Sequence, residues 1–316
     1  MKLAAYVHSI EEMKDVRRRG FRFVALHSML FPYVEGGVPP KSEQIDDIRK
    51  ALAKNELEPT DLVTFNGWYY LGLSGFMEQL PSGPRDPAYE KLRRHGVEQF
   101  EGMIKAAANL GCNQIFSLMG GRRVYHYDHQ EAWMKSVKEL EPVLERNGVK
   151  MCFLPHPGDF IEESDSAVDL IKSTKCKQIG YVYVLPHTFV LAGRMDADPA
   201  AMIRYAARAG VLTEVHVADS LKPAQMWIRD HFDTQPYHSH LLPGRGEVDI
   251  RGALEELVKQ RFDGPILMIP YRYGLSDTSF PELAGRAKGI VEKMLDGIES
   301  RTPRARNTRK SGPTRT

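Results

Sequence analysis

Strand-like and helix-like segments alternate along nearly the whole sequence, and this alternation restricts the fold more than any other feature. Short apolar runs are each followed by a longer segment with helical periodicity, and eight such pairs lie between residues 3 and 295. The expected strands are Leu3–Val7, Phe21–Leu26, Leu62–Phe65, Gln114–Leu118, Lys150–Leu154, Ile179–Val184, Leu212–Val217 and Ile266–Ile269. The expected helices are Ile10–Arg19, Ser42–Ala53, Ala88–Leu110, Glu131–Arg146, Ala167–Ser173, Ala200–Ala209, Ile250–Val258 and Glu282–Leu295.

Eight β-then-α units predict an α/β fold in which parallel strands close into a (β/α)8 barrel, the TIM barrel, rather than forming an open sheet. The 316 residues, 42% of them hydrophobic, suffice for one large core. Glycines that end a helix at little cost fall before five of the strands, at Gly20, Gly111, Gly148, Gly210 and Gly264. We therefore expect a single barrel domain over residues 1–298.

The end of the chain differs in composition from the barrel. Ser300–Thr316 has no acidic residue and six basic ones, so the net charge of +2 becomes about −4 without them. The segment is rich in Ser, Thr, Pro and Gly, and it has too few apolar residues to offset the entropy lost on ordering. We predict a disordered basic tail over residues 299–316. Such a tail can touch nucleic acid or an acidic surface, but the barrel sequence shows no basic stripe interleaved with aromatic residues, so nucleic acid is not the expected partner.

The sequence predicts a cytoplasmic protein that does not enter a membrane. No apolar run approaches the ~20 residues needed to cross a bilayer, and the start of the chain lacks the pattern of a secretory signal. The three cysteines, Cys112, Cys152 and Cys176, are scattered without metal-ligand spacing, which favours reduced thiols over disulfides. We expect Cys112 and Cys152 in the core.

Histidines recur where strands are expected to end. His156 follows the fifth strand, His187 follows the sixth, and His216 lies near the end of the seventh. His238 and His240 lie two residues apart in the next connection, where an extended chain would point both imidazoles to one side. Since the carboxyl ends of barrel strands share one rim, we expect these histidines to converge on a metal or catalytic site.

The remaining histidines are expected to have lesser roles. His27 lies at the end of the second strand, so it is a candidate intermediate between the rim histidines and the surface ones. Solvated surface positions are expected for His8, His95, His126, His129 and His231, which lie in loops or on helices.

Two long connections, Asn66–Pro87 and Ala218–Asp249, are expected to enclose a substrate at the same rim. Arg122 and Arg123 follow Met-Gly-Gly after the fourth strand, where guanidinium groups and backbone amides can hold an anionic group. Aromatic and basic residues that could wall a polyol ring are Trp68, Tyr69, Tyr271 and Arg272. For these aromatic residues, ordinary packing is an equal alternative.

Between Val149 and Gly264 the sequence resembles the sugar-phosphate isomerase/epimerase superfamily with the xylose-isomerase-like barrel, which includes endonuclease IV. The residues that carry the resemblance are Leu-Pro-His-Pro-Gly-Asp-Phe at 154–160, Ile-Gly-Tyr-Val-Tyr-Val-Leu-Pro-His-Thr-Phe at 179–189, Val-His-Val-Ala-Asp-Ser at 215–220, and His-Ser-His-Leu-Leu-Pro-Gly-Arg-Gly-Glu-Val-Asp at 238–249. The most similar subgroup is that of the inositol-catabolism isomerase-like proteins. The resemblance implies an isomerase or epimerase acting on a small polyol or keto-sugar, and a homo-oligomer.

The resemblance also implies a divalent metal, but not in the usual place. The family's four usual ligand positions read Leu154, Val184, His216 and Pro270 here, and three of these side chains cannot coordinate an ion. Members with three metals use a second cluster, whose positions correspond to His187, His238 and His240. Three histidines with an open position suit a catalytic ion such as zinc or manganese.

Moving a proton next to a carbonyl requires a base, an acid and a group that stabilises the enolate oxygen. His156 and His216 are the expected proton-transfer residues because imidazole titrates around pH ~6.5. Asp219 is expected to orient one of them or to serve as a turn residue, and Glu247 is either a second carboxylate or a cap of the helix starting near Val248.

Two functions therefore remain open at the level of sequence. The first is an isomerase or epimerase, or a lyase sharing the same enolate, acting on a small carbohydrate or cyclitol. The second is a catalytically degenerate barrel that serves as a binding or partner subunit, which the three lost ligand positions favour.

Overall fold

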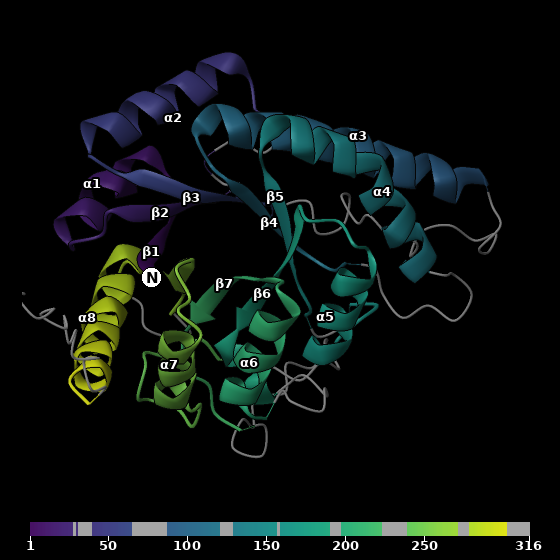
Figure 1. Cartoon of the computed structure of the whole chain (residues 1–316). Coiled ribbons are helices and arrows are strands. Elements are labelled where there is room, and N and C mark those ends of the chain that lie inside the picture. The colour runs from purple at the N-terminus through teal and green to yellow at the C-terminus, as the bar shows by residue number, and fades with distance from the viewer. Residues whose placement is uncertain are drawn as a thin grey trace, which may run out of the picture.

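The chain folds into a closed barrel of eight parallel strands, each followed along the sequence by a helix (Figure 1). The computed structural model describes residues 1–27, 30, 40–64, 87–120, 129–156, 159–189, 197–222, 239–270 and 278–301. Neighbours in the barrel are consecutive in sequence, and β1 closes the barrel on β8. The strands are β1 (Lys2–Val7), β2 (Phe23–His27), β3 (Glu58–Val63), β4 (Gln114–Leu118), β5 (Lys150–Leu154), β6 (Ile179–Val184), β7 (Leu212–Val217) and β8 (Pro265–Met268).

The helices surround the strands, as the alternation predicts (Figure 1). They are α1 (Ile10–Arg18), α2 (Ser42–Lys54), α3 (Pro87–Leu110), α4 (His129–Asn147), α5 (Ser164–Ser173), α6 (Pro199–Ala209), α7 (Ile250–Lys259) and α8 (Phe280–Glu299), with a short 3-10 helix η3 (Leu185–Phe189) after β6. The predicted TIM barrel is thus confirmed. The third strand departs most from its expected position, because it begins at Glu58 and carries polar Thr60 and Asp61, whereas only its apolar end was predicted.

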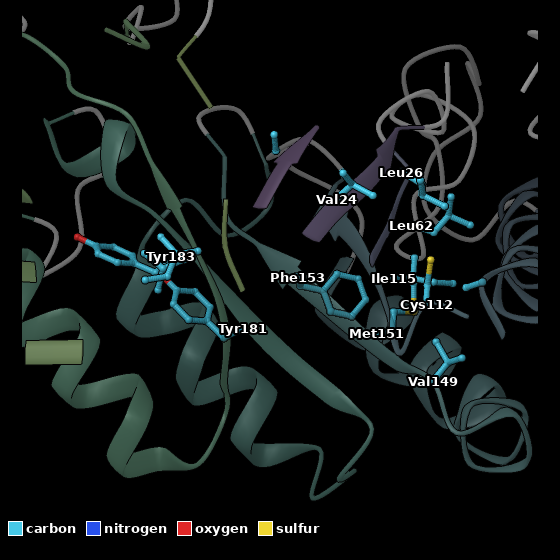
Figure 2. Packing of buried hydrophobic residues seen from close by; sticks show 14 of the residues in the cluster. Val24, Leu26, Leu62, Cys112, Ile115, Val149, Met151, Phe153, Tyr181 and Tyr183 are labelled. Atoms are coloured by element: carbon cyan, nitrogen blue, oxygen red, sulfur yellow. The ribbon is translucent and has the colours of Figure 1, made fainter. Parts of the chain in front are cut away.

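Side chains alternate along each strand between two apolar layers. One layer lies between strands and helices and includes Val24, Leu26, Ile115, Met151 and Phe153 (Figure 2). The other fills the barrel and consists of Ala4, Tyr6, Ala25, Val63, Phe116, Leu118, Cys152, Leu154, Val182, Val184, Ala218, Leu267 and Ile269. All three cysteines are buried free thiols, as expected.

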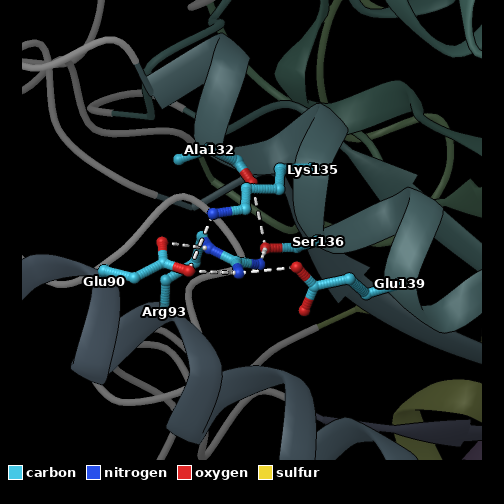
Figure 3. Close-up of polar contacts among 6 residues, drawn as sticks. All are labelled: Glu90, Arg93, Ala132, Lys135, Ser136 and Glu139. Carbon is cyan, nitrogen blue, oxygen red and sulfur yellow. Dashed lines mark hydrogen bonds and ion pairs between the residues drawn. The ribbon is translucent and has the colours of Figure 1, made fainter.

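Outside the barrel, a buried arginine joins α3 to α4 (Figure 3). Only 1% of the Arg93 side chain is exposed, and its guanidinium donates to Ser136 Oγ at 2.9 Å and to Glu139 at 2.7 Å. The same group donates to Glu90, and its hydrogen bonds lower the pKa of that carboxyl to about 2. Because each nitrogen of the guanidinium group has an acceptor, the contact holds α3 and α4 together.

The predicted tail lies largely outside the described residues, of which the last is Arg301, two residues after the end of α8. No helix in the described ranges combines the length and the apolar character that crossing a bilayer requires.

Two carboxylic acids lie inside the barrel. Glu214 of β7 accepts a hydrogen bond from Gln114 Nε2 through its Oε2 atom, and its Oε1 atom lies 2.6 Å from His216 Nε2. Burial raises the pKa of Glu214 to about 8 and lowers that of His216 to about 3. The pair is therefore held as a neutral acid and a neutral imidazole, with Oε1–H donating to Nε2. His216 then carries its own proton on Nδ1.

Asp61 of β3 is the second buried acid. Its Oδ2 atom lies 2.6 Å from Thr60 Oγ1, which is also 3.1 Å from the carbonyl oxygen of Val24. Thr60 Oγ1 is the donor in both contacts, so its one proton is shared between the carboxyl group of Asp61 and the carbonyl of Val24. Burial, and then the charge of Glu214, raise the pKa of Asp61 well above its ordinary value. The barrel interior thus contains two acids whose pKa values are raised by burial.

The buried acid at Glu214 predicts that stability falls as the pH rises. Between pH 6.5 and 8 the folded state keeps the Glu214 proton while an unfolded glutamate has lost it, so unfolding becomes easier by about 1.4 kcal/mol per pH unit for such a group. Unfolded histidines still carry part of a proton near pH 6.5, whereas the buried rings of His27, His216 and His240 carry none, so these residues oppose the trend in the lower part of the range. The contribution of Glu214 is therefore measured as a difference: between these pH values Glu214→Gln should lose on the order of 2 kcal/mol less stability than the wild type, by urea unfolding at a series of pH values.

The exposed residue Glu145 on α4 provides the matched control, and Glu145→Gln should keep the wild-type slope. An equal dependence of stability on pH in the wild type and in Glu214→Gln would show that Glu214 is buried as a carboxylate.

Candidate active site at the carboxyl rim of the barrel

Three histidines from different segments meet where β5, β6 and β7 end. His156 follows β5, His187 lies in η3 after β6, and His240 lies in the segment that follows β7. The ring centroids of His156 and His187 are 5.1 Å apart, and those of His187 and His240 are 6.2 Å apart. We call these residues the β5–β7 histidine group. The structure thus brings together three of the five rim histidines singled out in the sequence, while His238 lies outside the described residues.

His240 is held by the backbone in a defined tautomer. Its Nδ1 atom lies 3.0 Å from the carbonyl oxygen of Ile269, which can only accept, so Nδ1 carries the proton and Nε2 the lone pair. Burial lowers the pKa of His240 to about 3, with smaller contributions from the charges of nearby His216 and His156. A neutral imidazole whose distal nitrogen is anchored to a carbonyl is the form in which histidine binds metals.

His216 lies deeper, on the barrel side of this group. Its ring contacts Phe116 at a centroid distance of 5.0 Å and Tyr6 at 6.2 Å. With Nε2 bound to Glu214, the atom of this ring that can donate to a substrate oxygen is Nδ1. The bottom of the candidate site is therefore formed by an imidazole whose donor, the Nδ1–H group, has a fixed position.

Asp219 secures the segment that carries His240. Its Oδ1 atom accepts from the backbone amides of Ser220 at 2.9 Å and Val248 at 3.0 Å, and its Oδ2 atom accepts from that of Gly244 at 2.8 Å. A Cβ on Gly246 would approach Asp219 Oδ1 to 2.4 Å, so only glycine fits there. The carboxylate thus holds this segment together through three backbone amides.

Glu247 also contributes to the loop. Its Oε2 atom accepts from the backbone amide of Lys222 at 3.1 Å, and Oε1 is 3.7 Å from the ammonium of the same lysine. The expectation that Glu247 caps the next helix is corrected by the structure, because Asp249 is the N-cap and accepts from the amide of Gly252 at 2.9 Å.

A second set of imidazoles, missed in the sequence, lies at the ends of β1 and β2. The ring centroids of His8 and His27 are 4.8 Å apart, and each ring contacts Tyr6, at 5.9 and 5.7 Å. We call His8 and His27 the β1–β2 histidine pair. The expectation of a solvated surface position is wrong for His8, whose side chain is 18% exposed. It is also wrong for His129, which is buried and stacked on Phe160.

The other predicted substrate contacts cannot be placed. Those that lie outside the described residues are Trp68, Tyr69, Arg122, Arg123, Tyr271 and Arg272. Their roles remain predictions.

Only part of the predicted metal site lies within the described residues, because His238 lies outside them. Within the part of the chain that the structure describes, no three His, Cys, Asp or Glu side chains are arranged to hold an ion. His187 and His240 are neighbours, and the tautomer of His240 suits a ligand, so two of the three predicted donors fit a metal centre. The family's usual ligand positions Leu154 and Val184 lie in the apolar cluster inside the barrel.

Solved structures with similar folds include several sugar epimerases. A D-tagatose 3-epimerase-like protein has a TM-score of 0.67 and 16% identity, covering 95% of this chain and 99% of its own. D-psicose 3-epimerase from Clostridium cellulolyticum H10, solved with D-tagatose, has a TM-score of 0.68 and 16% identity over 93% and 99% of the two chains. The IOLI protein with a bound zinc atom has a TM-score of 0.67 and 17% identity over 94% and 99%. At these identities the likeness shows the fold.

The sequence itself carries the family signal. A search of curated proteins finds no match. Residues 13–292, however, match the family described as xylose isomerase-like TIM barrel, which spans most of the chain. The chain belongs to the xylose isomerase-like TIM barrel family.

Proposed function

We propose that the protein is an isomerase or epimerase that moves a proton at a carbon next to a carbonyl in a small carbohydrate or cyclitol. One observation carries the proposal: imidazoles from several strand ends gather over one rim, with His216 beneath them. The sugar epimerases among the structural neighbours support this class of reaction. A lyase that forms the same enolate would use the same groups.

The chain's own residues would divide the work according to their hydrogen bonds. His156 is partly exposed beside His187 and is the proposed base. His216, fixed by Glu214, would donate from Nδ1 to a substrate oxygen and would not act as the base. Trp68, Tyr271 and Arg272 are proposed to wall the sugar, and Arg122 with Arg123 to hold an anionic group. A carbonyl oxygen that gains charge is stabilised by a donor held in place before reaction.

A divalent ion, zinc or manganese, is proposed on His187, His238 and His240. The zinc atom in the IOLI structure and the carbonyl-anchored ring of His240 support it. When bound, the ion would polarise a carbonyl or acidify water.

The metal proposal predicts stoichiometric binding. After incubation with zinc and removal of excess, the protein should retain about one ion per chain by elemental analysis. The double variant His238→Ala/His240→Ala should retain almost none, because a single remaining imidazole binds weakly. His95→Gln, exposed on α3, serves as the control and should bind as the wild type does. Equal amounts of zinc in the wild type and the double variant, or no zinc in either, would remove the metal from the proposal.

The enzyme proposal predicts solvent exchange at a substrate carbon. In D2O, with zinc or manganese supplied, the protein should introduce deuterium next to the carbonyl of at least one member of a panel containing D-psicose, D-tagatose and inosoles, as followed by NMR. His216→Ala should slow exchange by roughly 10²-fold or more, the range for losing a positioned proton donor. His95→Gln should have no effect.

The second candidate function is a degenerate barrel that binds a ligand or partner without reaction. The burial of Leu154 and Val184 in the inner apolar cluster favours it. Saturable binding of a panel sugar without any deuterium exchange would select this alternative over the enzyme.

A further inference from the structure

The β1–β2 histidine pair lies across the barrel mouth from the β5–β7 histidine group. Because the strands close in the order β1 to β8, β1 stands opposite β5, and β2 stands opposite β6. His8 follows β1 and His27 ends β2, whereas His156 and His187 follow β5 and β6. Any molecule resting over the middle of the mouth therefore has imidazoles on both sides.

Tyr6 and His216 occupy the space between the two sets. The ring of Tyr6 contacts both histidines of the pair and also contacts His216 at a centroid distance of 6.2 Å. His216 in turn acts electrostatically on His240 of the opposite group. The two sets thus belong to one continuous site and share one floor.

His8 is oriented as a proton acceptor. Glu12 Oε2 lies 2.8 Å from the backbone amide of His8 and 3.2 Å from its Nδ1 atom. The carboxylate accepts from both, so Nδ1 carries the ring proton and Nε2 the lone pair. No described residue forms a hydrogen bond with Nε2 of His8. Phe280 packs edge-on against the ring at 4.9 Å and limits its rotation.

His27 is not an equivalent candidate for this role. It is 7% exposed, and burial together with the charge of His8 lowers its pKa to about 3 despite the opposing charge of Glu12. A ring that resists protonation cannot take up a substrate proton readily. Its neutral ring instead packs against the ring of His8 and helps to hold that ring toward the mouth of the barrel.

We propose that His8, oriented by Glu12, is a second proton-transfer residue that serves the substrate face opposite to the β5–β7 histidine group. The assignment rests on the proposed function and specifies it as an epimerisation with two acid–base groups. In one direction His8 Nε2 takes the proton, the C–H electron pair forms the enediolate double bond, and the carbonyl π pair moves to oxygen. His156, the proposed base of the opposite group, then returns a proton to the other face, so the configuration inverts without net oxidation.

The experiment uses the two C3 epimers D-psicose and D-fructose in D2O, with wild type, His8→Gln and the control His95→Gln. A variant without one of two bases should invert at least about 10²-fold more slowly. It should still exchange the proton of one epimer, because the remaining base removes the proton and returns deuterium to the same face. Circular dichroism and thermal unfolding verify that His8→Gln is folded, and His8→Asn is the second variant.

The outcomes separate this inference from the function on which it rests. Inversion at the wild-type rate in folded His8→Gln and His8→Asn overturns the role of His8 while leaving the epimerase intact. Equal loss of exchange from both epimers overturns the assignment to one face. No exchange by the wild type with any probe defeats the proposed function itself, and this assignment with it.

Glu12 is a positioning residue, and its test needs a readout beyond activity. Glu12→Ala removes the oxygen atom that accepts from both the backbone amide and Nδ1 of His8, so the ring proton should no longer be held on Nδ1 and should shift toward Nε2. Nitrogen-15 NMR of the imidazole reports this shift directly, and kcat should fall with little change in KM. An unchanged tautomer together with an unchanged kcat would overturn the role of Glu12.

Discussion

Closure of the parallel sheet is the constraint on which the rest of the structure depends. It gathers every carboxyl strand end at one rim, so residues as distant in sequence as His8 and His240 face one mouth. The apolar layer between strands and helices packs the strands that carry that rim against the surrounding helices. The chemistry of the site is consequently decided by which side chains stand at the strand ends and by what holds each of them.

Three of the described site histidines are each held by a neighbour that also determines which ring nitrogen carries the proton. Glu12 orients His8, Glu214 orients His216, and the carbonyl of Ile269 orients His240. Asp219 folds the segment that delivers His240. Water is largely excluded below the rim, where the acids and imidazoles stay neutral because charge is costly there. The resulting site presents donors and acceptors in fixed positions.

The sequence was sufficient for the barrel and for one side of the mouth. Periodicity located all eight strands, and the histidines after β5, β6 and β7 stood out because they follow apolar runs. His8 was missed because it was grouped with the histidines in loops or on helices, for which a solvated surface position was expected. Asp61 and Glu214 were missed because an acid within a strand breaks the apolar pattern, and only the folded barrel shows that both side chains are buried.

The most direct test of the account is a crystal structure of the protein soaked with D-tagatose. The account predicts that the sugar lies over Tyr6 and His216, with the carbon next to its carbonyl between His8 on one side and the β5–β7 histidine group on the other. A sugar bound elsewhere, or one with both sets of imidazoles on the same face of that carbon, would contradict it.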